Sequence, residues 1–147
     1  MKSGIKSTER ELLDYGRHIA SLVPKGSKVC IEDFSYGSKG KGVSTQYAVG
    51  FSIRFALLDN GIEFIKPTPS QLKKYATGKG NTTKDNMTIP ILRLWDFENK
   101  SDNVRDAFVL AQLARGLDSY DPNRIMAESP LGLYQYQLEV LQAITSK

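Results

Sequence analysis

"KVCIEDF", residues 28–34, decides the predicted fold, because it reads as a short β-strand between segments with helical patterns. A second short strand is predicted at residues 63–66, just before Pro67 and Pro69. Strands that are separated by helices pair in parallel, so the sequence predicts an α/β domain. Two strands are too few for a stable sheet, and we therefore expect further strands to come from elsewhere.

The segments around these strands have helical patterns with recognisable ends. Pro24 and Gly26 stop the first helix, and the pair Asn60-Gly61 ends the second. Ser70 is a candidate cap for the third helix, whereas Pro90 must kink or restart the fourth. The predicted helices span residues 8–23, 45–58, 70–75, 83–97, 103–117 and 133–145.

Length and cysteine content indicate one domain in a reducing compartment. A chain of 147 residues can bury a core without cross-links. Cys30 is the single cysteine and cannot form an internal disulfide. No apolar N-terminal stretch resembles a signal peptide, so we expect a cytoplasmic protein with no membrane span.

Positive charge is concentrated in the middle of the chain. Residues 35–84 contain eight basic side chains and only two acidic ones, Asp59 and Glu63. Such asymmetry indicates a face for a polyanion, of which nucleic acid is the commonest. The alternative interpretation is a solvated lysine-rich loop.

Two groups of acidic residues are candidate metal ligands. Glu32 lies within an apolar strand, where a carboxylate is costly to bury unless it is paired or bound to a cation. Asp106 can share a helix face with Asn103 or Asp102. Simpler interpretations are an exposed strand end for Glu32, and an N-cap with dipole-favouring acids for the helix.

Three motifs in order carry a family resemblance: the strand glutamate with "SYGSKGKG", then "PTPSQLKKYATGKGNTTKDNM", then "DNVRDAFVLAQLA". Over residues 5–116 the chain resembles the RuvC-like Holliday junction resolvases of the ribonuclease H-like superfamily. The resemblance implies a ribonuclease H-like α/β fold and two Mg²⁺ ions, with Mn²⁺ as the alternative metal. It matches Glu32 and Asp106 to catalytic acids that hold these ions. Asn103 falls where many members have another acid, and Asp102 is the alternative ligand.

The chain differs from the family in its N-terminal part. Family members begin with a three-stranded meander that carries a further catalytic aspartate, and residues 1–16 look like the tail of that meander. The expected architecture is therefore one partial domain, residues 1–147, with an incomplete sheet and a C-terminal helical extension at 118–147. A fragment or split enzyme completed by another polypeptide, and a degenerate member that binds without cutting, remain alternatives. Substitution of the aspartate by Glu11 or Asp14 is disfavoured, because that helix directs its side chains elsewhere.

The basic segment is interpreted as a clamp on the DNA backbone. Gly78 and Gly80 would allow close approach to a phosphate, and lysines would neutralise its neighbours. Tyr36 could stack on an unpaired base, although a packed core aromatic is the simpler interpretation. The candidate DNA-binding residues are Lys39, Lys41, Lys73, Lys74, Lys79, Lys84, Tyr36, Gly78 and Gly80.

The predicted function is that of a Mg²⁺-dependent, structure-selective endonuclease acting on branched DNA such as Holliday junctions. An exposed sheet edge needs a cover, so we expect a homodimer or a second polypeptide that supplies the missing strands. The alternative is a non-catalytic subunit that binds branched DNA. A nucleotide-binding protein is disfavoured, because the "TGKG" spacing fails the phosphate-loop pattern.

Overall fold

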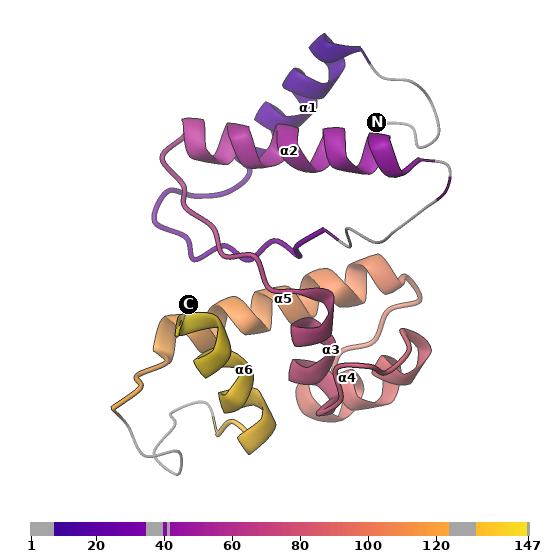
Figure 1. Cartoon of the computed structure of the whole chain (residues 1–147), viewed down its shortest axis with the longest axis vertical. Coiled ribbons are helices and arrows are strands. Elements are labelled where there is room, and N and C mark those ends of the chain that lie inside the picture. The colour runs from indigo at the N-terminus through magenta and orange to yellow at the C-terminus, as the bar shows by residue number, and fades with distance from the viewer. Residues whose placement is uncertain (1–7, 35–39, 41, 124–131, 147) are drawn as a thin grey trace. The chain divides into compact units, whose positions relative to one another are not determined.

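The computed structural model describes residues 8–34, 40, 42–123 and 132–146, and it is built from helices. The chain divides into two compact units (Figure 1). The first unit comprises residues up to Val29 together with Phe34–Phe64, and the second comprises Cys30–Asp33 and the chain from Ile65 onward. Among the described residues, no helix has the length and apolar character that a membrane crossing requires.

The first unit is a pair of packed helices, α1 (Glu9–Ser21) and α2 (Val43–Asp59). Gly16 allows the close contact between them, because a Cβ at this position would lie 2.4 Å from the backbone oxygen of Ser52. The guanidinium of Arg54 lies 4.2 Å from the ring centroid of Phe34 and donates to the carbonyl of Gly50 at 2.9 Å. The contact with Arg54 holds Phe34, the last residue of the "KVCIEDF" stretch, against α2.

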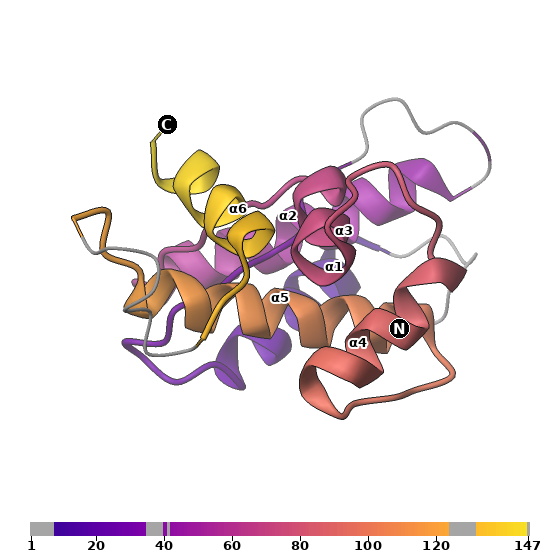
Figure 2. The same ribbon diagram turned by 90° about the horizontal axis from the view of Figure 1, so that it is seen from below.

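The second unit contains α3 (Pro69–Thr77), the short 3₁₀ helix η1 (Asp85–Met87), α4 (Thr88–Trp95), α5 (Asp102–Ser119) and α6 (Gln135–Thr145). Helices α3 and α6 lie side by side and both contact α5 (Figure 2). Apolar side chains from all four α-helices, with Met87 of η1, form one core. Its members are Leu72, Tyr75, Ala76, Met87, Ile91, Val109, Leu113, Leu117, Val140 and Leu141.

The helix ends follow local signals in the sequence. Thr68 and Gln71 form a capping box at the start of α3, where Thr68 rather than Ser70 is the cap. Ser101 caps α5, so Asp102 is the first residue of that helix and not its cap. Pro90 lies in the first turn of α4, where its missing N–H costs no helical hydrogen bond. The predicted fourth helix therefore restarts after η1.

The predicted α/β ribonuclease H-like fold with an incomplete sheet is wrong, because the described part of the chain contains no β-strand. Residues 30–33 are extended and run parallel to residues 65–67 through a single bridge between Cys30 and Ile65. The N–H groups of Ile31 and Asp33 donate to the carbonyls of Ile65 and Pro67, at 2.9 and 2.8 Å.

The pairing stops at Pro67 for a physical reason. Proline has no N–H to continue a ladder, and the α3 capping box begins at the next residue. Two short extended segments are too few to form an independently stable sheet. The stretch that suggested a sheet is thus a connector between helices.

Candidate functional site

Glu32 lies at the end of the extended segment and is half-buried in the second unit. Burial is the largest influence on its carboxyl group and raises its pKa above the ordinary value. The nearby lysines Lys84 and Lys73 act in the opposite direction, whereas the negative charge of Asp106 raises the pKa further. Glu32 therefore shares an electrostatic environment with one acid and two bases.

Asp106 is held in place by α5 and is only 8% exposed. The ammonium group of Lys84, the residue before η1, forms an ion pair with its Oδ2 atom. A buried carboxylate needs such a partner, because desolvation of an unpaired charge is costly. Residues far apart in the sequence thus form one cluster, Glu32, Lys73, Lys84 and Asp106, which we call the acid–lysine cluster.

The other predicted metal ligands lie near the start of α5 but differ in exposure. Asp102 and Asn103 are both exposed, whereas Asp106 is buried. The causes of the raised pKa of Glu32 include Asp106 but not Asp102 or Asn103. Asp102 lies in the first turn of α5, where a negative charge favours the helix dipole. The position of Asp102 therefore agrees with the simpler interpretation of a dipole-favouring acid, although Ser101 is the N-cap.

The acid–lysine cluster has the donor chemistry for a hard cation, but few donors. Carboxylate oxygens are the ligands that Mg²⁺ prefers, and Glu32 and Asp106 bring two carboxylates near each other. In the part of the chain that the structure describes, no group of three or more acidic, histidine or cysteine side chains could hold a metal. A metal site at this cluster would therefore need ligands beyond the two carboxylates, one of which is already paired with Lys84.

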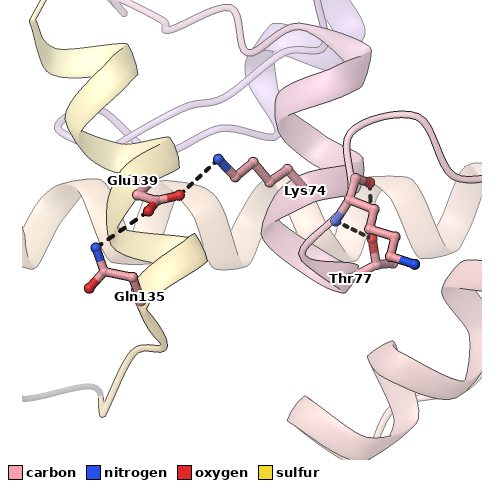
Figure 3. A network of polar contacts seen from close by, with 5 residues as sticks. Lys74, Thr77, Gln135 and Glu139 are labelled. Atoms are coloured by element: carbon pink, nitrogen blue, oxygen red, sulfur yellow. Dashed lines mark hydrogen bonds and ion pairs between the residues drawn. The ribbon is translucent and has the colours of Figure 1, made fainter.

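Lys74 does not belong to this cluster. Its Nζ atom lies 2.9 Å from Oε2 of Glu139 on α6, and Gln135 donates to the other carboxylate oxygen at 3.4 Å (Figure 3). These contacts lower the pKa of Glu139, with the Lys74 hydrogen bond as the largest cause. The adjacent lysines therefore differ. The charge of Lys73 lowers the pKa of Glu32, whereas Lys74 links α3 to α6.

The two predicted phosphate-approach glycines have clear conformational roles. Gly78 is the left-handed C-cap of α3, with φ of +87°, and its N–H donates to the Lys74 carbonyl at 2.8 Å. At Gly80, an added Cβ would lie 2.3 Å from Oγ of Ser70. Between them, Lys79 is exposed, and its N–H donates to the Thr77 hydroxyl at 3.1 Å. We call residues 77–80 the TGKG loop.

The remaining predicted DNA contacts, Tyr36, Lys39 and Lys41, lie outside the described residues. The pairing of Lys84 with Asp106 was missed by the sequence reasoning, which assigned Lys84 to DNA alone. No local signal identifies this pair, because the two residues belong to separate helical segments. No protein-family model, no curated protein and no solved structure matches this chain.

Proposed function

We propose that this chain is a Mg²⁺-dependent endonuclease subunit that acts on branched DNA such as Holliday junctions. The observation that carries the proposal is the gathering of Glu32 and Asp106 beside Lys84 and Lys73 in one unit. Acids with a shared electrostatic environment and basic neighbours are typical of sites that handle phosphate esters with a metal ion. The resemblance of the three sequence motifs to RuvC-like resolvases supports the same activity.

Each member of the acid–lysine cluster has a role in this proposal. Glu32 and Asp106 would hold Mg²⁺, which when bound activates a water molecule and stabilises the leaving oxygen. The ammonium group of Lys84 neutralises Asp106 in the free chain and is well placed to move to a phosphate oxygen. Lys73 supplies a second positive charge close to Glu32.

DNA binding would extend from this cluster to the TGKG loop. Lys79 is exposed there and can contact a backbone phosphate, which gives affinity but little sequence information. Selectivity would then depend on DNA shape, as the resemblance to junction resolvases implies. A bacterial cytoplasm or a phage-infected cell is the setting that goes with this activity.

A partner chain or a second copy is part of the proposal. Leu13, Phe51 and Phe55 are exposed on the first unit, where α1 and α2 border an open groove of about 540 Å³. Helix α2 has apolar residues around its whole circumference, which is typical of a helix that is covered on more than one side. A polypeptide that covered this face could also bring the additional ligands that a two-ion site needs.

A second candidate function is non-catalytic binding of branched DNA. The observation that favours it is the ion pair of Lys84 with Asp106, because the lysine already supplies the positive charge that a metal would bring. The small number of acidic groups in the described cluster favours it too. Both candidates use the same basic surface, so cleavage must distinguish them.

Cleavage of a synthetic four-way junction tests the proposal. We expect Mg²⁺-dependent cutting by the purified protein together with any copurifying chain, and loss of cutting in Glu32→Gln and Asp106→Asn. Glu139→Gln is the matched control, since it makes the same change of acid to amide at the ion pair with Lys74. Junction binding without cutting by the wild-type protein would reject the endonuclease and leave the second candidate.

A further inference from the structure

The start of α6 presents two stacked aromatic rings next to the TGKG loop. The rings of Tyr134 and Tyr136 are nearly parallel, with an interplanar angle of 3° and a centroid separation of 5.7 Å. Tyr134 is 58% exposed. The Tyr136 ring lies against Gly78, only 3.6 Å from the place that a Cβ would take. The aromatic pair therefore adjoins a loop whose next residue, Lys79, is exposed and positively charged.

The protein holds this pair in position through α3. The side chain of Gln137 is buried, accepts a hydrogen bond from the Tyr134 N–H at 3.0 Å and donates to the Tyr75 carbonyl at 3.2 Å. The ion pair of Lys74 with Glu139, shown in Figure 3, joins the same two helices at the surface. These contacts position the backbone that carries both rings, which limits the conformational entropy lost when a ligand binds.

A flat exposed ring beside a lysine suits a nucleotide. Bases stack on aromatic side chains regardless of sequence, and a neighbouring cation contacts the phosphate. Tyr136 is half-buried, and burial is the main cause of its raised pKa, so this inner ring backs the outer one. We propose that Tyr134, backed by Tyr136, stacks on an unpaired base of single-stranded DNA while Lys79 contacts its phosphate.

This inference rests on the DNA-binding part of the proposed function but does not require catalysis. The two stacked tyrosines would supply a site for the unpaired bases that arise where a DNA branch opens. An apolar protein segment would be a less suitable occupant, because the loop next to the rings carries the exposed positive charge of Lys79.

Binding of fluorescently labelled oligo(dT) tests this stacking platform of Tyr134, Tyr136 and Lys79. The measurement is made in EDTA so that no cleavage occurs. Tyr134→Ala should weaken binding about 5- to 100-fold, the range expected for loss of one stacked base. Tyr134→Phe keeps the ring face and should bind within about twofold of the wild type. Leu22→Ala is the matched control, because this apolar side chain is similarly exposed, at 65%, but belongs to the first unit.

A second readout follows stacking directly. An oligonucleotide containing 2-aminopurine should lose fluorescence on binding the wild type and Tyr134→Phe, but keep it with Tyr134→Ala or Tyr134→Leu. Circular dichroism establishes that each variant is folded, and the Leu variant replaces the Ala variant if the latter unfolds.

Several results would overturn the inference: no binding of oligo(dT) by the wild type, equal binding by folded Tyr134→Ala, or weakened binding by Tyr134→Phe. Tighter binding of oligo(rU) than of oligo(dT) would overturn the assignment to DNA. Junction cleavage that persists in Tyr134→Ala together with unchanged oligo(dT) binding rejects the platform alone. Absence of cleavage with intact stacking rejects the endonuclease alone.

Discussion

Gly116 sets the spacing between α5 and its neighbours in the second unit, and we predict that Gly116→Ala destabilises the protein. A Cβ at this position would lie 2.5 Å from the Tyr75 hydroxyl oxygen and 3.2 Å from a methyl group of Leu141. Alanine favours a helix interior over glycine by about 1 kcal/mol. Overpacking a closed core costs about 1–3 kcal/mol, so the expected net loss is about 1 kcal/mol.

A double-mutant cycle with Tyr75→Phe makes this prediction specific. Removal of the phenolic oxygen removes the closest clash, so Gly116→Ala in the Tyr75→Phe background should be neutral or stabilising by up to about 1 kcal/mol. The measurement is urea unfolding of the four proteins, followed by circular dichroism. A coupling energy of about 1 kcal/mol is expected between the two sites. Stabilisation by Gly116→Ala in the wild type, or additivity within about 0.3 kcal/mol, would refute the packing of α3 on α5 described above.

Three further predictions concern the charged groups. The pKa of Glu32 is raised in the folded protein, so its contribution to stability is greatest at low pH and is lost as the pH rises through the folded pKa. Glu32→Gln should therefore raise the urea midpoint at pH 7, and this gain should shrink toward pH 4. A gain in the urea midpoint that is the same at both pH values would contradict this. Lys84→Met removes the largest influence that lowers this pKa, so NMR titration of the Glu32 carboxyl should give a higher value than in the wild type, whereas Lys74→Met should leave it unchanged. Lys79→Ala should reduce the slope of log K against log salt for junction binding by about one, the contribution of one phosphate contact, while Lys74→Ala, whose lysine is paired with Glu139, should change it less.

The helices could be predicted from the sequence because their signals are local. The apolar repeat and the Pro24–Gly26 stop determine α1, and α5 follows its apolar residues from residue 102. The sheet could not be predicted in the same way, because a strand is defined by its neighbours. Residues 30–33 are extended and pair with residues 65–67, and Pro67 ends that pairing.

The candidate site likewise combines local features, which the sequence can indicate, with contacts between distant segments, which it cannot. That Glu32 and Asp106 lie near each other could be expected only from the family resemblance, because a contact between distant segments leaves no local pattern. Gly78 and Gly80 were singled out for close approach to a phosphate, which stays a prediction; the constraints that the structure describes there are a helix cap and the side chain of Ser70. Lys73 and Lys74 look equivalent in the sequence. Their separation became visible only when α3 was placed against α6, which carries Glu139.

The raised pKa of Glu32 bears on the metal role that we propose for this residue. Half-burial and the nearby negative charge of Asp106 both make the ionised form of Glu32 less favourable. Lys84 and Lys73 only partly offset that cost, since the pKa of Glu32 stays raised despite them. A bound cation would relieve both the burial of Glu32 and its repulsion by Asp106. Addition of Mg²⁺ should consequently stabilise the wild type but not Glu32→Gln, and equal stabilisation of both would remove the metal from this cluster.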